Sequence, residues 1–105
     1  MFARSVTMHL KPNTVSAFNK TLEKEIMPLL QKQKGFRDEL TLVSSNGSEV
    51  LGISLWDQKQ DAEAYNRAAY PDVQRILSKL IEGTPQVLTY EVSMSTIHKT
   101  ASQHA

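Results

Sequence analysis

Four segments of the chain alternate between apolar and polar side chains, and two longer segments between them repeat apolar side chains at helical spacing. Alternation with a period of two is typical of a half-buried β-strand, whereas repeats at i, i+3, i+4 and i+7 indicate an amphipathic helix. The alternating segments are residues 2–10, 36–44, 49–56 and 87–94, and the helical repeats run from Val15 to about Lys34 and from Ala62 to Leu80. The order strand, helix, strand, strand, helix, strand is that of the split βαβ ferredoxin-like motif. It predicts an α+β fold, βαββαβ, with a four-stranded antiparallel sheet.

A tight hairpin is expected between the second and third strands. The residues Ser-Asn-Gly-Ser at 45–48 separate these strands, and Asn-Gly is a strong turn signal because both residues tolerate positive φ. With the Asn-Gly pair as the loop, Val43 lies opposite Val50, and Arg37 lies opposite Trp56.

Proline, glycine and capping residues predict where the helices begin, bend and end. Pro28 lacks an amide hydrogen and predicts a kink in the first helix, which Gly35 then terminates. Asp57 and Gln60 have the spacing of a capping box, so the second helix should begin directly after the third strand. Pro71 divides that helix in two, because proline is favoured at the first position of a helix.

Parity sorts the predicted sheet into an apolar face and a mixed face. Helices of this motif cover only one face, and we expect it to be the apolar one. The apolar set is Phe2, Val6, Met8, Leu10, Leu40, Leu42, Leu51, Ile53, Leu55, Leu88, Tyr90, Val92 and Met94. The mixed set is Ser5, Thr7, His9, Arg37, Glu39, Thr41, Val43, Val50, Gly52, Ser54, Trp56, Thr89 and Glu91. The β-branched and aromatic members of the mixed set suit contact with the sheet of a second copy, which would also enlarge a small core.

Composition narrows the class of protein. The 105 residues suffice for one domain, and a net charge of +1 without a long basic run argues against nucleic acid as a partner. The chain has no cysteine, which excludes disulfides and thiolate catalysis and fits a reducing compartment. No segment reaches the roughly 18 apolar residues of a membrane span, and the first residues alternate instead of forming an apolar signal block. We expect a cytoplasmic protein without a membrane partner.

The order of elements is accompanied by three local features: Gly35-Phe36 at the end of the first helix, Trp56 at a strand-to-helix corner, and Tyr90-Glu91-Val92 in the last strand. Together they resemble the antibiotic biosynthesis monooxygenase-like family over residues 1–95, leaving 96–105 as a polar tail that is frayed or ordered only by a partner. The resemblance implies a dimeric α+β barrel, in which two ferredoxin-like subunits pack sheet against sheet. The family includes cofactor-free oxygenases of aromatic polyketides and quinols, heme-degrading enzymes and proteins without an established activity.

Heme-degrading members of that family carry an asparagine on the first strand, a tryptophan on the helix after the corner and a histidine that ligates iron. The matching positions fall near Val6, at Tyr65 and at Arg75, so all three residues are replaced. Arginine offers only hydrogen-bond donors and cannot ligate iron. We therefore expect neither heme nor another cofactor.

Few residues suggest a catalytic base. His9, Glu39 and Glu91 share the mixed face, and a histidine with a carboxylate has the residue types that proton transfer needs. A polar structural role for His9 is the alternative. The other histidines, at positions 98 and 104, lie in the polar tail, and this scatter lacks the convergent spacing of a metal site. We expect no metal.

Several residues suggest substrate binding. Arg4 is a cation among apolar neighbours, so it needs a carboxylate, an exit to water or an anionic ligand. Tyr65, Tyr70 and Tyr90 could converge as aromatic walls and hydroxyl donors of a pocket, or could simply be core residues. Trp56 lies on the mixed face, which we expect to meet the second copy. There it either packs at that contact or contacts substrate.

Two functions remain after these considerations. The first is a cofactor-independent oxygenase that acts on an aromatic or quinol-like substrate in a pocket between sheet and helices. The second is a non-catalytic ligand-binding or stress-associated barrel, which the lack of a compact catalytic constellation leaves open. RNA binding on the open sheet would need stacking aromatic residues on the central strands, and Ser5, Thr7, Gly52 and Ser54 do not provide them.

Overall fold

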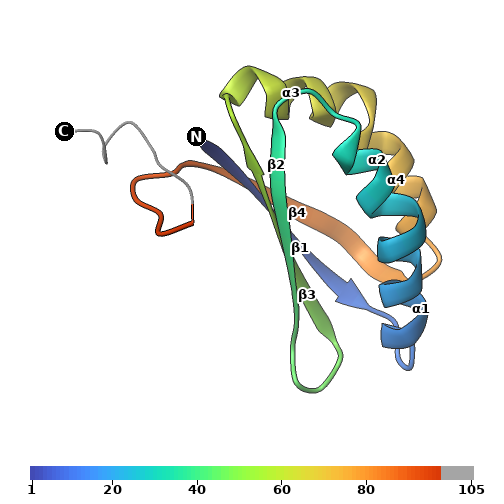
Figure 1. Ribbon diagram of the computed structural model, residues 1–105. Coiled ribbons are helices and arrows are strands. Elements are labelled where there is room, and N and C mark those ends of the chain that lie inside the picture. Colours follow the sequence, from blue (N-terminus) through green and yellow to red (C-terminus); the bar gives the residue numbers. More distant parts are fainter. Residues whose placement is uncertain (98–105) are drawn as a thin grey trace.

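A four-stranded antiparallel sheet carries its helices on one face (Figure 1). The computed structural model describes residues 1–97. Its elements are β1 (Phe2–Leu10), α1 (Val15–Thr21), η1 (Leu22–Ile26), α2 (Met27–Gln31), β2 (Phe36–Val43), β3 (Glu49–Trp56), α3 (Lys59–Ala68), α4 (Tyr70–Leu77) and β4 (Ile81–Glu91). The strands lie in the order β2-β3-β1-β4. The expected α+β ferredoxin-like fold is confirmed, and most of the expected tail, residues 98–105, lies outside the described residues.

The first helical segment contains one irregular turn. In η1 the Met27 amide donates to the Leu22 carbonyl, five residues earlier, which is the π-helical pattern. Pro28 follows at the start of α2 and has no amide hydrogen for an α-helical bond, so the wide turn relieves its clash with the preceding turn. The irregularity expected at this proline thus takes the form of a π-helical turn. The segment ends at Gln31, a few residues before the expected Lys34.

The β2–β3 hairpin has the predicted register near its turn, with Val43 opposite Val50. At the far end Phe36 pairs with Trp56 and Asp38 with Leu55, so Arg37 is the extra residue of a β-bulge. The expected pairing of Arg37 with Trp56 is therefore wrong.

The second helical segment also begins differently from the prediction. Arg37 forms an ion pair with Asp57 in place of the expected capping box. Helix α3 begins at Lys59 behind Gln58, which makes no side-chain capping bond. The division of the segment is as predicted, because Pro71 stands in the first turn of α4. No helix in residues 1–97 is long and apolar enough to span a membrane.

Strand β4 begins at Ile81, earlier than the predicted 87, and includes Gly83 and Pro85. Within residues 1–97 it is an edge strand that pairs only with β1, and edge strands tolerate proline because one side of their backbone needs no partner. A register shift opposite Thr7 to His9 absorbs the irregular part.

The two faces of the sheet are the reverse of the expectation on β2, β3 and β4. Phe2 pairs with Trp56 and Arg4 with Ser54, so the even positions of β1 share a face with the mixed set. That inner face lies under the helices and includes Phe2, Arg4, Val6, Met8, Glu39, Thr41, Val43, Val50, Gly52, Ser54 and Trp56. The outer face carries Leu40, Leu42, Leu51, Ile53, Leu55, Leu88 and Tyr90. Parity correctly separated the two sets of β2 and β3, but it could not say which set the helices cover.

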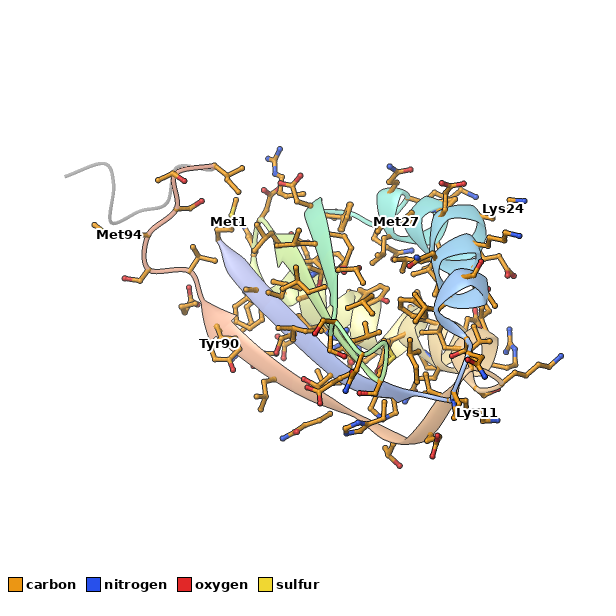
Figure 2. The ribbon with its side chains drawn as sticks, turned by 90° about the horizontal axis from the view of Figure 1, so that it is seen from below. Met1, Lys11, Lys24, Met27, Tyr90 and Met94 are labelled. Atoms are coloured by element: carbon orange, nitrogen blue, oxygen red, sulfur yellow. The ribbon has the colours of Figure 1, made fainter. Side chains whose placement is uncertain are left out.

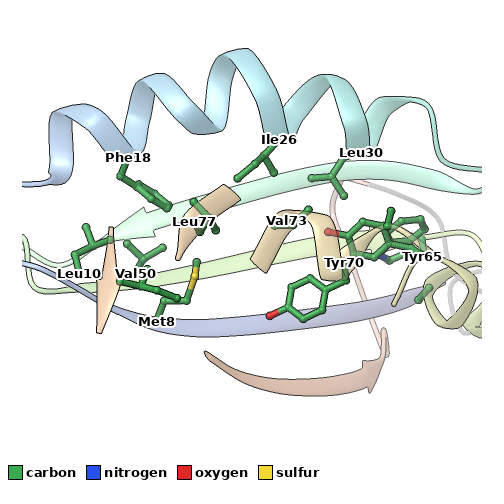
Figure 3. Close-up of a cluster of buried hydrophobic side chains, with 14 of the residues drawn as sticks. Met8, Leu10, Phe18, Ile26, Leu30, Val50, Tyr65, Tyr70, Val73 and Leu77 are labelled. Atoms are coloured by element: carbon green, nitrogen blue, oxygen red, sulfur yellow. The ribbon is translucent and has the colours of Figure 1, made fainter. Parts of the chain in front are cut away.

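The core lies between the helices and the inner face. Phe18, Val50 and Trp56 have no exposed surface. Phe18, Ile26 and Leu30 point from the first helical segment toward the sheet (Figure 3). Burial of each such side chain contributes about 1.5–3 kcal/mol. This packing fixes the helices over the inner face of the sheet and so shapes the site described below.

Candidate functional site

A small cavity, the inner cavity, lies between the helices and the inner face and has a volume of about 50 Å³. Its apolar wall consists of Val6, Met8, Phe18, Leu22, Ile26, Leu30, Val50, Val73 and Leu77. Its polar wall consists of Arg4, Glu39, Thr41, Ser54, Tyr65 and Tyr70. Tyr65 and Tyr70 lie at one end of the buried cluster, and Phe18 lies toward the other (Figure 3).

Strand pairing brings the polar residues together. Arg4 pairs with Ser54, and Ser54 pairs with Glu39, so the three form one row across β1, β3 and β2. In the next row Gly52 separates Val6 from Thr41. A Cβ on Gly52 would lie 3.2 Å from the Glu39 Oε1 atom. Because Gly52 has no side chain, the space that the Glu39 carboxyl occupies stays open.

Arg4 is the buried cation of the site, with only 3% of its surface exposed. Its Nη2 donates to the Asn66 Oδ1 over 2.8 Å, and the guanidinium lies 4.0 Å from the ring centre of Tyr70 and 5.2 Å from that of Tyr65. No carboxylate of residues 1–97 forms an ion pair with it. Cation–π contact offsets part of the cost of burial, which amounts to several kcal/mol for an ion without a counterion. A buried arginine in this state favours an anionic group in the cavity.

Glu39 is the carboxyl group of the cavity. Burial raises its pKa to about 7, against the lowering effects of the Thr41 hydrogen bond and the Arg4 charge. The Thr41 hydroxyl donates to Glu39 Oε1 over 3.0 Å. Near neutral pH such a carboxyl exists in both protonation states, which is the property of an efficient general acid or base.

Two tyrosines supply neutral hydroxyl groups. Burial raises the pKa of Tyr65 to about 12 and also raises the pKa of Tyr70, although the nearby Arg4 charge opposes both shifts. The buried Tyr70 hydroxyl makes no hydrogen bond of good geometry within residues 1–97, but the Arg4 guanidinium lies close enough to lower its pKa as a weak hydrogen-bond donor. Because Arg4 can engage only the oxygen lone pairs, the Tyr70 hydrogen can be donated to a ligand oxygen.

Trp56 lies behind the wall of the inner cavity and is not part of it. Its Nε1 donates to the Ser54 hydroxyl over 2.9 Å, and its ring centre lies 5.1 Å from that of Tyr65 and 5.5 Å from that of Phe36. The indole therefore supports Tyr65 from behind. The expected location of Trp56 on a face toward a second copy, opposite Arg37, is wrong because the indole is fully buried under α3 and Arg37 pairs with Asp57.

The remaining candidate residues lie elsewhere. Tyr90 is 52% exposed on the outer face, and Figure 2 shows it on β4, away from the helix that carries Lys24 and Met27. His9 is exposed and pairs with Glu49 and Glu82 in the strand ladders. The expected combination of His9 with Glu39 is not formed, because the two residues lie on opposite faces of the sheet. Glu91 is exposed at the end of β4.

Sequence reasoning missed two participants. Thr41 was assigned to the mixed face, but its hydrogen bond to Glu39 could not be anticipated. No sequence pattern marks Asn66 as a site residue, because its contact with Arg4 depends on the distance between α3 and β1. Within residues 1–97 no three histidine, aspartate or glutamate residues gather as metal ligands would.

No protein-family model matches the chain, and no curated protein does. Solved structures do match. The monooxygenase from the gene ActVA-Orf6 of Streptomyces coelicolor, solved with nanaomycin D, has a TM-score of 0.77 at 17% identity, covering 93% of this chain and 92% of that one. The NE2512 protein of unknown function from Nitrosomonas europaea has a TM-score of 0.76 at 14% identity, covering 94% and 95%. A candidate antibiotic biosynthesis monooxygenase from Deinococcus radiodurans has a TM-score of 0.74 at 14% identity, covering 90% and 95%.

These likenesses concern the fold. The chain has the ferredoxin-like fold of the antibiotic biosynthesis monooxygenases, as the sequence resemblance implied.

Proposed function

We propose that the chain is a small-molecule oxygenase that needs no bound cofactor and oxidises an aromatic, quinol-like substrate whose reacting hydroxyl enters the inner cavity. The observation that carries this proposal is the Glu39 carboxyl, whose pKa of about 7 is set beside the buried Arg4 cation in one cavity. A base and a cation at one place suit a reaction that begins by forming a substrate anion.

The chemistry follows from these groups. Ionised Glu39 accepts the proton of a substrate phenol, and the resulting phenolate oxygen is held by the Arg4 guanidinium and the Tyr70 hydroxyl. The electron-rich ring then reacts with molecular oxygen. One oxygen atom enters the ring as a carbonyl and the other leaves as water, which takes up the two hydrogens lost from the ring C–H and O–H groups. Phenol and oxygen thus give quinone and water, and the substrate itself is the reductant.

Oxygen uptake on a panel of quinols and naphthols tests this function. Glu39→Gln should lower kcat by about 100-fold or more, whereas His9→Gln, on the opposite face, should leave kcat unchanged. The wild-type rate should rise through about pH 7 as Glu39 ionises. Tyr70→Phe should slow the reaction and the matched Tyr90→Phe should not. Uptake that is insensitive to Glu39→Gln contradicts the mechanism, and saturable binding without uptake identifies the protein as a non-catalytic ligand-binding barrel.

We further propose that the chain forms a homodimer through the outer face. Leu40, Leu42, Leu88 and Tyr90 are between 47% and 57% exposed there, which is unusual for large apolar residues on one continuous surface. Antiparallel sheets bury such a face by packing on a second sheet. The contact residues therefore come from the apolar set, not from the mixed set of the sequence expectation.

Sedimentation velocity tests the dimer. The wild type should sediment as a particle with twice the 11.8 kDa mass of one chain. Leu40→Glu with Leu88→Glu should yield a folded monomer, because two carboxylates would be buried opposite an apolar partner. Glu substitutions at Ser16 and Asn19, both exposed on α1, serve as the control. A wild-type monomer at high protein concentration would contradict the proposal.

A further inference from the structure

A second hollow, the α3 cleft, lies beside the inner cavity and has a volume of about 240 Å³. It is lined by Phe2, Arg4, Lys59, Ala62, Glu63, Asn66, Arg67, Val87 and Thr89. These residues come from one side of α3 and from the inner faces of β1 and the edge strand β4. No sequence pattern predicted a pocket at this edge.

Arg4 lines both hollows, whereas its hydrogen-bond partner Asn66 lines only the α3 cleft. The guanidinium therefore stands between the inner cavity and the cleft. Because Asn66 is exposed, water can replace Arg4 as its partner when the 2.8 Å bond between them opens. The Arg4–Asn66 pair thus lies at the boundary between the two hollows.

Neither hollow alone suits an aromatic substrate. The inner cavity, at about 50 Å³, holds a few water molecules. Small-molecule pockets generally begin near about 300 Å³, and the α3 cleft adds about 240 Å³ to the inner cavity. A ligand that occupies both hollows reaches that size, with its hydroxyl at Glu39 and its body in the cleft.

The cleft carries an excess of positive charge. Lys59, Glu63 and Arg67 follow one another at four-residue spacing and so lie on one side of α3. None of the three forms an ion pair within residues 1–97. With Arg4 the cleft holds three cations and one carboxylate. Guanidinium groups bind carboxylates through paired hydrogen bonds, so an organic acid is the ligand that this arrangement fits.

We propose that the α3 cleft is the acid-binding end of the substrate pocket, and that the substrate is an aromatic hydroxy acid whose carboxylate binds Lys59 and Arg67. This inference rests on the proposed function for the role of the hydroxyl group, but binding of the acid is independent of turnover. Arg4, which lines both hollows, then lies where they meet and holds the substrate hydroxyl at the Glu39 end.

Calorimetric titration with 6-hydroxy-2-naphthoate tests the inference, because this probe carries its hydroxyl and carboxylate at opposite ends of the ring. Its methyl ester is the matched neutral ligand. The acid should bind about tenfold more tightly than the ester, and the ratio should fall as salt screens the charges. Lys59→Gln with Arg67→Gln should reduce the ratio to about twofold or less, and Glu63→Gln should raise affinity for the acid about twofold. The control pair Lys24→Gln and Lys79→Gln removes the same charge from exposed positions outside both hollows.

Equal affinity for acid and ester overturns the inference. An acid-to-ester affinity ratio that is unchanged in the variant with Lys59→Gln and Arg67→Gln also overturns it, and so does the failure of both probes to bind. Oxygen uptake separates this result from the proposed function. If the acid binds selectively but no quinol causes oxygen uptake, the acid-binding cleft is retained and the oxygenase proposal is overturned. If quinol oxidation depends on Glu39 but is the same for substrates with and without a carboxylate, the oxygenase proposal is retained and the acid-binding cleft is overturned.

Discussion

The raised pKa of Glu39 makes the stability of the protein depend on pH in a definite direction. The group ionises near 4.5 in the unfolded chain and at about 7 in the folded protein. Between these values the folded state binds more protons than the unfolded state, so the free energy of unfolding falls as pH rises. The stabilising contribution of protonated Glu39 is fully present below pH 4.5 and is lost as pH rises through about 7. The full shift corresponds to about 3 kcal/mol.

Urea unfolding at about pH 5 and about pH 8 measures this contribution, and the wild type should lose about 2 kcal/mol from Glu39 over that interval. Glu39→Gln carries no charge at either pH and should lack this component. The difference between the two pH slopes, at one protein concentration, isolates Glu39 from all other titrating groups. Glu23→Gln, at an exposed position of η1, should retain the wild-type slope. Equal slopes for wild type and Glu39→Gln would refute the assignment of a buried carboxyl.

Three further predictions concern stability and can be checked by thermal or urea unfolding. Trp56→Phe should cost about 2–3 kcal/mol, because the indole is fully buried and loses both packing volume and a hydrogen bond. Gly35→Ala should cost more than Gly83→Ala: both residues have positive φ, +77° and +71°, but an added Cβ at Gly35 would meet the Asp61 side chain whereas the one at Gly83 meets nothing within 4 Å. Equal costs would show that Asp61 moves aside freely. Arg4→Met should leave stability unchanged or raise it by about 1 kcal/mol, because a thioether replaces a buried cation that forms no ion pair within residues 1–97. A large loss would instead show that the Asn66 and tyrosine contacts of Arg4 are structural.

The predicted hairpin shows how far local chemistry reaches. The Asn-Gly turn and the alternation around it placed Val43 opposite Val50, as observed. The prediction failed at the other end, where a bulge at Arg37 shifts the register. The ion pair of Arg37 with Asp57 accompanies the bulge, and it depends on the approach of the strand end to the start of α3. Extending the register residue by residue from the turn could not predict the bulge at Arg37.

The candidate site was only partly accessible from the sequence. Arg4 stood out because a cation among apolar neighbours must have a partner, and Tyr65 and Tyr70 were candidates for either a pocket or the core. The structure places all three at the inner cavity, and both tyrosines also belong to the core. Glu39 was identified as a titratable residue but was paired with His9, since both belonged to the mixed set. The pairing of β1 with β3 separates them, because Met8 shares a face with Val50 and His9 points the opposite way.

By itself, the sequence determined the order of the elements, the β2–β3 turn and the two sets of side chains on that hairpin, because these depend on the period of the chain and on local turn chemistry. Tertiary structure alone decided which set the helices cover. Large apolar residues lie on both faces of this sheet, and Leu40, Leu42, Leu88 and Tyr90 are exposed on the outer one, so hydrophobicity does not distinguish its two sides. The same choice brings Glu39 beside Arg4 instead of His9, and only the spacing of α3 from β1 and β4 creates the cleft beyond them.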